Sequence, residues 1–495
     1  MSNENQGMRR HFALAVIGVV SLITFGLCVP PLVGQGGGPA GTRTAPGATR
    51  DWTQDMQMKI TEPFTLASVG DVIIIRPASQ YDDPGFQSAI KIIRDADVGF
   101  GNFESLIRDE LNFQGPLGGS MVGTKEVAPD LKALGFKIMN RAGNHLFDSN
   151  QEGLFETMRL MQEAGLVYAG AGRDLEDARA AHFLETPKGR VGLVSMFSEV
   201  AGGGLSRLGA SYRVGNTGGR PGLNAMNLTK TIVVTADQLE AMKKVRDAVY
   251  THRTDYSNPV DPPAAETADQ LELFGTLYKV GESQGGLSYT MNPGDLRGTL
   301  RSIRNGKEYS DFMMTAIHSH EGATVLQESL FEDQTPDFLV TLAHDAIDNG
   351  ADAFLGSGPH LLRGIEIYKG KPIFYDLGEF FREWDWSCDC DDDQANSTTT
   401  SAERAVRGHE VRGVVEPVNY ESVIALSKYD KGKLQEVRLY PIDSRQASPI
   451  SQRGIPRIAS PETAQRILQR LQKLSDPFGT KISIEGNVGV IHVAQ

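Results

Sequence analysis

Short apolar runs alternate with segments of helical spacing along most of the chain. A short apolar run between turn signals is typical of a buried strand, whereas apolar residues three and four apart indicate a helix. The predicted strands cover residues 64–75, 98–103, 136–139, 166–169, 191–197, 312–320 and 353–355. The predicted helices cover residues 83–96, 129–134, 152–164, 236–249, 336–349 and 462–474, with Thr335 as the N-cap of the fifth. This alternation predicts an α/β (α+β) fold, with its main domain over residues 61–384.

Three segments depart from this alternation. Residues 199–311 are rich in Gly and polar residues, and we expect an insertion there, either a lid over a site or a peripheral elaboration. Residues 385–412 are acidic and then rich in Ser and Thr, so a solvated polar loop is expected, since the acids lack the spacing of an EF-hand. Its Cys388 and Cys390 are too close in sequence for an unstrained disulfide. Residues 413–495 return to strands and a helix that complete the domain.

The N-terminal segment has the pattern of an export signal. Arg9 and Arg10 precede an apolar run that ends at Cys28, and a stretch rich in Pro, Gly and Ala follows. Residues 1–28 are therefore predicted to be an export signal or a membrane anchor, and residues 29–60 a flexible linker. The paired arginines also suit twin-arginine export of a folded protein. We expect a periplasmic or extracellular protein, or one anchored in the membrane and facing outward.

The charge balance excludes one class of partner. The formal net charge is -13, and no basic stripe offsets it. Because nucleic-acid binding relies on basic contacts to phosphates, we expect no nucleic-acid partner.

Residues suited to metal binding or proton transfer follow successive predicted strands. Taken singly, each has a simpler explanation, such as an Asx turn at Asp71, a surface acid at Glu104 or a buried, hydrogen-bonded His318. Their shared position is the stronger signal, because sites in α/β sheets are built at the carboxyl ends of strands. The residues are Asp71, Glu104, Asn144 with His145, His318 with His320, and His360.

These side chains form a mixed set of nitrogen and oxygen ligands. Such a set suits one or two divalent transition ions, Mn, Fe or Zn, better than a thiolate zinc site or an all-oxygen calcium site. A carboxylate bridging two ions about 3.5–4 Å apart would generate hydroxide near neutral pH and support displacement at phosphorus.

The order of the motifs resembles a known family. Gly70-Asp71, Asn102-Phe-Glu104, Gly143-Asn-His145, Ile317-His-Ser-His-Glu321 and Gly356-Ser-Gly-Pro-His360 stand in the order found in CapA-type poly-γ-glutamate capsule biosynthesis proteins. This family is a branch of the calcineurin-like metallophosphatase superfamily. The stretch Leu362–Gly378 resembles the closing hairpin of the family, and the C-terminal segment Ala464–Ile491 resembles the tail of its longer members.

The resemblance implies a four-layer αββα sandwich with an insertion and a C-terminal extension. It implies that Asp71, Glu104, Asn144, His318 and His360 bind metal, with His320 as a further ligand, and that His145 protonates a leaving group. The implied function is a metal-dependent phosphohydrolase step in the synthesis of poly-γ-glutamate capsule or another envelope polymer. The expected partners are an anionic polymer or phosphoester substrate, a polymer-synthesis complex of the envelope, and a membrane contacted through the N-terminal segment.

Two departures from the family pattern keep alternatives open. Where relatives carry a further histidine shortly before the last one, this chain has Ser357 and Gly358, and where the hairpin usually ends in Asn it has Glu379. Ser357, Glu379 and Asp148 are residues near the site whose roles the sequence leaves open. One alternative is a non-catalytic accessory that binds or helps export the polymer and keeps a degenerate metal site. Another is a peptidase-like or amidase-like activity with the same ligands.

Overall fold

The computed structural model describes residues 55–117, 121–200, 208–250, 267–281, 286–324, 332–383, 417–449 and 451–493. All of them belong to one compact unit that begins at Asp51. The expected export signal, most of the expected linker and the expected acidic loop with its two cysteines lie outside the described residues. Among the helices described, none combines the length and apolarity needed to span a lipid bilayer.

The first of two large sheets has a parallel centre and an antiparallel flank. Strand β1 pairs in parallel with β2 on one side, and on its other side it pairs in antiparallel fashion with β20 and in parallel with β19. The order along the sheet is β22-β23-β21-β20-β1-β2-β5-β6, with β19 beside β1. The strands are β1 (Phe64–Ile73), β2 (Val98–Phe103), β5 (Ile138–Asn140), β6 (Val167–Ala169), β19 (Glu379–Arg382), β20 (Glu421–Asp430), β21 (Lys433–Asp443), β22 (Ser483–Glu485) and β23 (Val488–His492).

The second sheet is also mixed around a parallel centre. Strand β15 pairs in parallel with β9 and with β16. The order is β12-β13-β11-β9-β15-β16-β18-β17, with β14 beside β11 and β8 beside β9. The strands are β8 (His182–Thr186), β9 (Gly189–Val200), β11 (Ala225–Val234), β12 (Gln270–Leu273), β13 (Thr276–Val280), β14 (Leu287–Met291), β15 (Phe312–His318), β16 (Ala353–Ser357), β17 (Ile365–Tyr368) and β18 (Lys371–Phe374).

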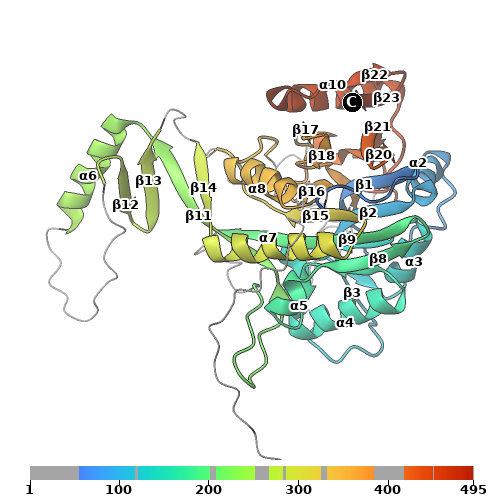
Figure 1. Cartoon of the computed structure of the whole chain (residues 1–495), viewed down its shortest axis with the longest axis horizontal. Coiled ribbons are helices and arrows are strands. Elements are labelled where there is room, and N and C mark those ends of the chain that lie inside the picture. The colour runs from blue at the N-terminus through green and yellow to red at the C-terminus, as the bar shows by residue number, and fades with distance from the viewer. Residues whose placement is uncertain are drawn as a thin grey trace, which may run out of the picture. The chain divides into compact units, whose positions relative to one another are not determined.

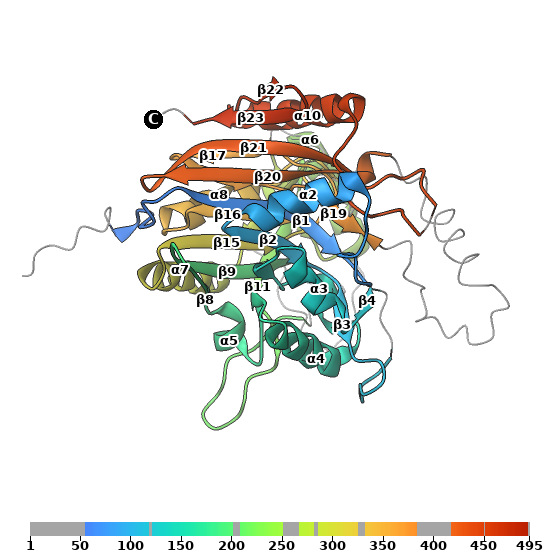
Figure 2. The ribbon, with the colours of Figure 1, turned by 90° about the vertical axis from the view of Figure 1, so that its right-hand side faces the viewer.

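The two sheets pack face to face, and helices cover both outer faces (Figures 1 and 2). Phe64 and Phe100 of the first sheet share a buried core with Phe312 and Leu355 of the second. The helices on the first sheet are α2 (Pro84–Asp95), α3 (Val127–Ala133) and α4 (Asn150–Glu163), and those on the second are α7 (Pro293–Glu308) and α8 (Asp337–Asp348). Helix α10 (Pro461–Ser475) adds its apolar face to the core between the sheets. The structure is therefore the expected four-layer αββα sandwich.

Alternation of side chains along each strand explains the layers. In β1, Phe64 and Leu66 face the second sheet, whereas Ala67 and Val69 pack under the helices of the first. Both faces of the central strands are covered, so these strands read as continuous apolar runs.

The segment 199–311, expected as an insertion, contributes a strand and a helix to the layers of the sandwich. The expected helix is present as α6 (Ala236–Tyr250), but β11 extends the second sheet beside β9, and α7 is a second helix. Helix α7 buries Ile303 against the outer face of that sheet. The expected cap of α8 is wrong, because Pro336 rather than Thr335 is the N-cap residue, and proline has no side-chain acceptor for a cap hydrogen bond.

Candidate metal centre

Strand register brings the candidate residues to one edge of the sandwich. On the first sheet, Asp71 lies beside Asn102 of β2 on one side and beside Glu379 of β19 on the other. On the second sheet, His318 lies beside Ser357. The carboxyl ends of the parallel strands therefore meet here, as expected for a site in an α/β sheet.

Three of the expected ligands form one compact group. Asp71, Glu104 and His318 are buried, and one ligand atom from each lies within 4.8 Å of the others. His318 Nδ1 is 3.5 Å from Asp71 Oδ1, and His318 Nε2 is 3.5 Å from Glu104 Oε1. This group has the residue types and spacing that can hold a metal ion.

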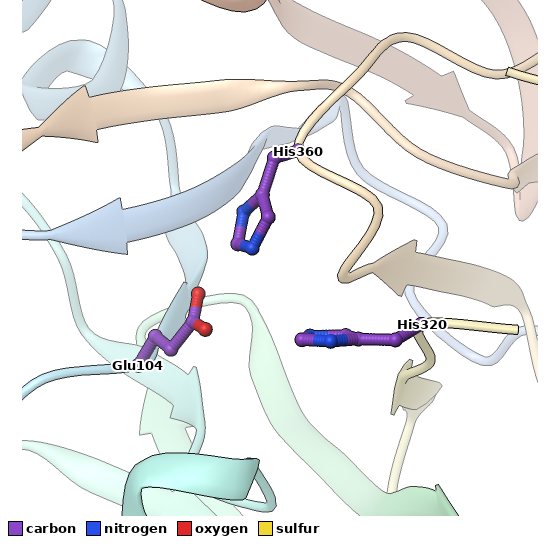
Figure 3. Close-up of side chains that lie close together, drawn as sticks. All are labelled: Glu104, His320 and His360. Atoms are coloured by element: carbon purple, nitrogen blue, oxygen red, sulfur yellow. The ribbon is translucent and has the colours of Figure 1, made fainter. Parts of the chain in front are cut away.

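Glu104 is shared with a second group of the same kind. Its carboxylate, His320 and His360 also bring one ligand atom each within 4.8 Å of one another. Figure 3 shows the three side chains converging from separate segments of the chain. The ring centroids of His320 and His360 are 5.4 Å apart.

The short 3₁₀-helix η1 (Asn144–Phe147) places two more candidates at this edge. Asn144 Oδ1 lies 3.0 Å from His318 Nε2, so its carbonyl oxygen joins the ligand cluster. His145 stands slightly apart, with Nε2 4.0 Å from Glu104 Oε1. Its Nδ1 lies 2.6 Å from Asp148 Oδ2, so Asp148 fixes the orientation of this imidazole. His145 retains partial exposure, with 21% of its side-chain surface accessible.

Glu104 shows most directly that these residues fit a cation. Its side chain is fully buried, and neither carboxylate oxygen accepts a hydrogen bond from any described residue. Burial of an unsatisfied carboxylate is costly unless a cation or a donor compensates it. A divalent ion among Glu104, Asp71 and the three imidazoles would provide that compensation.

Buried charges at this edge shift the ionisation of the cluster. Burial disfavours a charged Asp71, but hydrogen bonds and charge from His318 and His360 outweigh it and hold its pKa well below the usual range. Burial also opposes charge on His318, yet Glu104 and Asp71 raise its pKa to about 9. Burial, together with the charge of His318, keeps the pKa of His320 well below that of a free imidazole. Without a metal ion the cluster therefore favours an ionised Asp71, a neutral His320 and a protonated His318, so a metal ion that binds His318 would displace its proton.

Two asparagines support the cluster, and we did not identify them from the sequence. Asn102 Nδ2 donates to Asp71 Oδ1 at 2.7 Å and lies 3.0 Å from His318 Nδ1. Asn140 Nδ2 donates in turn to Asn102 Oδ1 at 2.7 Å. A signal was present for Asn102, because residues two apart in a strand share a face and Glu104 follows it by two.

Gly358, one of the two positions where relatives carry the further histidine, is closed to any side chain. Gly358 has a φ of 130°, and a Cβ there would lie 2.4 Å from the backbone oxygen of Ser319. Ser357 Oγ lies 3.1 Å from His318 Nδ1, so Ser357 supports a ligand from behind. His320 follows the backbone that occupies this space, and it supplies an imidazole to the cluster instead.

Glu379 also lies within the site. Its Oε1 is 2.9 Å from His360 Nδ1, and its other oxygen accepts from Arg382 Nη1. Asp376, another buried acid that we did not identify, accepts from the backbone N–H of Gly378 at 2.7 Å. Burial and the nearby Asp71 raise the pKa of Asp376 well above that of a free carboxyl group.

Comparisons with known proteins show the family of this chain. The model of the family "Bacterial capsule synthesis protein PGA_cap" matches residues 65–383, which contain every residue of the cluster. "Uncharacterized protein y4sH" of Sinorhizobium fredii is 40% identical over 462 residues, covering 90% of this chain and 96% of that relative. "Capsule biosynthesis protein CapA" of Bacillus anthracis is 23% identical over 334 residues, covering 66% of this chain and 61% of that relative.

Among solved structures, a hypothetical protein from Thermus thermophilus aligns with 77% of this chain and 99% of its own, with 12% sequence identity and a TM-score of 0.34. The family model covers well over half of the chain and ends at Glu383, directly after β19. The resemblance to CapA-type proteins is thus confirmed, and the chain belongs to the bacterial capsule synthesis protein PGA_cap family.

Proposed function

We propose that this protein is a metal-dependent phosphohydrolase that acts outside the cytoplasm in the synthesis of an anionic envelope polymer such as poly-γ-glutamate. One observation carries the proposal. A fully buried Glu104, with no hydrogen-bond donor among the described residues, lies at the junction of two groups of metal-binding side chains. A partially exposed His145 stands beside them.

The residues present would suit one or two divalent transition ions, Mn, Fe or Zn. Asp71, Glu104, Asn144, His318, His320 and His360 would supply the ligands. A bound ion of this kind activates water and stabilises the charge that develops on a phosphoryl group. The protein would hold the ligands rigidly, because five of the six side chains project from strand ends or from turns next to them.

His145 would serve as the general acid. Its Nδ1 is held by Asp148, so Nε2 is the ring nitrogen left to donate a proton. A leaving-group oxygen near Glu104 would lie within reach of Nε2, and protonation would make it a better leaving group. Asp148 would stabilise the charged imidazolium before that transfer.

Elemental analysis provides the direct test. We expect at least one transition ion per purified wild-type chain, a lower metal content in Asp71→Ala and His360→Ala, and cleavage of an aryl phosphate monoester or diester by the wild type. Glu366→Gln is a matched control, because Glu366 also pairs with a histidine, His344, at 2.9 Å but stands outside the cluster. A wild-type protein that stays free of metal and inactive after reconstitution with Mn or Zn would refute the proposal.

A second candidate is a non-catalytic accessory that binds the polymer or helps its export. The closed position at Gly358 favours it, because that position has no side chain to add to the ligand set. His145→Ala in a polymer-producing strain distinguishes the two candidates. The accessory role predicts normal polymer production in this variant, whereas the enzymatic role predicts its loss. An amidase-like activity would appear as cleavage of γ-glutamyl amide bonds with the aryl phosphates left intact.

The proposed location rests on the N-terminal segment and on the family. Fusion of a reporter that is active only outside the cytoplasm to the C-terminus should give signal with the complete chain and none after removal of residues 1–28. Signal from the shortened fusion would refute export through this segment.

A further inference from the structure

Two carboxylates flank a single nitrogen of His360. Asp71 and Glu379 are direct neighbours on β1 and β19. Asp71 Oδ2 lies 3.1 Å from His360 Nδ1, and Glu379 Oε1 lies 2.9 Å from the same atom. All three side chains are at most 1% exposed. Like charges directly opposite each other in a sheet are unfavourable, so this arrangement needs a compensating cation.

Arg382 provides one of the compensating charges. Its Nη1 donates to Glu379 Oε2, and its guanidinium carbon lies 5.0 Å from the ring centroid of Tyr420. Residues three apart in a regular strand face opposite sides, but β19 carries an irregularity in its pairing with β1. Asp71 pairs with Glu379 and Val72 with Phe381, so β19 has an extra residue at this point. This bulge turns Glu379 and Arg382 to the same side.

The backbone at His360 is also specialised. Its φ is 58°, in the left-handed region that a residue other than glycine rarely occupies. Such a conformation costs free energy and persists only where surrounding contacts fix it. The imidazole is therefore fixed at its backbone, and its Nδ1 lies within ion-pair distance of both carboxylates.

We propose that Glu379, held by Arg382, is a positioning residue that keeps the proton of His360 on Nδ1 and so presents Nε2 to a metal ion. The hydrogen bond that a ligating histidine donates from its other ring nitrogen selects the tautomer and orients the ring. Arg382 occupies the second oxygen of Glu379, which prevents Glu379 from becoming a ligand itself. This proposal rests on the metal site of the proposed function, and it concerns how tightly that site binds.

The test compares metal affinity, measured by competition with a chromophoric chelator for Zn²⁺ and for Mn²⁺. We expect Glu379→Gln to bind each ion about 10–100-fold more weakly than wild type, which is the usual effect of losing such a partner. Glu366→Gln changes a part-buried glutamate–histidine pair outside the cluster, and it should bind metal as the wild type does. Because Glu379→Gln leaves Arg382 buried beside a neutral group, Glu379→Gln with Arg382→Gln is a second variant that removes both charges.

The outcomes separate this proposal from the proposed function. Wild-type binding with weaker binding by a folded Glu379 variant supports the positioning role, and wild-type affinity in a folded single or double variant overturns it. Absence of binding by the wild type overturns the metal site itself. Near-ultraviolet circular dichroism verifies folding. If the single variant does not fold, the metal affinity of the double variant decides between the outcomes. Equal loss of affinity in Glu366→Gln would also overturn the proposal, since the effect would then be general.

Discussion

A buried acid lies at each end of strands β15 and β16, and the two acids differ in their hydrogen-bond partners. At the amino-terminal end, Asp352 accepts from Lys307 Nζ at 2.6 Å and from the backbone N–H of Met313 at 2.8 Å, and it lies 3.0 Å from Lys371 Nζ. At the carboxyl end, Glu104 has no hydrogen-bond donor among the described residues. Lysine side chains compensate the charge of the first cluster, whereas the charged neighbours of Glu104 in the second are imidazoles, which can bind a metal ion instead of a proton. Compensation by the chain's own residues, rather than burial alone, thus separates a structural cluster from a candidate functional one.

The largest effect on stability should come from the compensated end. Asp352→Ala leaves Lys307 buried without its partner, so we expect the free energy of unfolding to fall by about 3–5 kcal/mol. Denaturant unfolding of metal-free protein measures this. Asp348→Ala is the control, because its pair with Lys369 is exposed and should contribute little. A loss below about 1 kcal/mol for Asp352→Ala would contradict the structural role of this cluster.

The next effect concerns activity at the other end. His145→Gln should lower kcat for an aryl phosphate about 10²–10⁴-fold, the range for loss of a general acid, with the metal content unchanged. His344→Gln is the control, since His344 stacks on Tyr368 with ring centroids 3.9 Å apart, outside the metal cluster. Unchanged kcat in His145→Gln would remove His145 from the chemistry.

Metal binding should stabilise the fold only through the Glu104 cluster at the carboxyl ends of β15 and β16. At a hundredfold excess of free metal over its Kd, ligand linkage raises the free energy of unfolding by about 2.7 kcal/mol. Wild-type protein should show this increment with Mn²⁺ and lose it with a chelator, whereas Glu104→Gln should show little of it. If Mn²⁺ raised the free energy of unfolding of Glu104→Gln as much as that of the wild type, the ion would bind at a site other than Glu104.

The smallest expected effect is the contribution of Asp352 to the pH dependence of the free energy of unfolding. Burial opposes ionisation of Asp352, but Lys307 and Lys371 outweigh it and lower the pKa of this carboxyl group. The unfolded chain therefore binds the proton first as the pH falls, so stability present above about pH 4 is lost below it. Asp352→Asn should flatten the fall in unfolding free energy between about pH 5 and pH 3 by at most about 1.4 kcal/mol per pH unit. If the unfolding free energy of metal-free Asp352→Asn fell with pH as steeply as that of metal-free wild type, Asp352 would not be the titrating group.

Most layers of the fold were predictable because the central strands are apolar on both faces. The sequence of α7 was harder to interpret, since it contains several arginines and glycines, although Leu296, Leu300 and Ile303 do follow helical spacing. Strand β11 interrupts its apolar residues with Asn227, Thr229 and Lys230, so its sequence lacks the continuous apolar run of the central strands.

The residues at the site were predictable where the strand-end rule applied. It brought Asp71, Glu104 and His318 together without knowledge of the sheet order. Contacts that depend on local irregularity were not predictable. The pairing of Glu379 with Arg382 needs the bulge in β19, and the closed position at Gly358 depends on the path of Ser319.

The pairing of β1 with β19 also has a consequence for the order of folding. Ile75 N–H, just beyond β1, donates to Glu383 Oε2, just beyond β19, and 308 residues separate the two. Closing so long a loop costs chain entropy before any contact repays it, and non-local pairing is slow. A ribosome-bound chain lacking β19 would contain Asp71 and His360 but not Glu379. Metal loading should therefore be a late event in the life of the chain, after synthesis has passed Arg382.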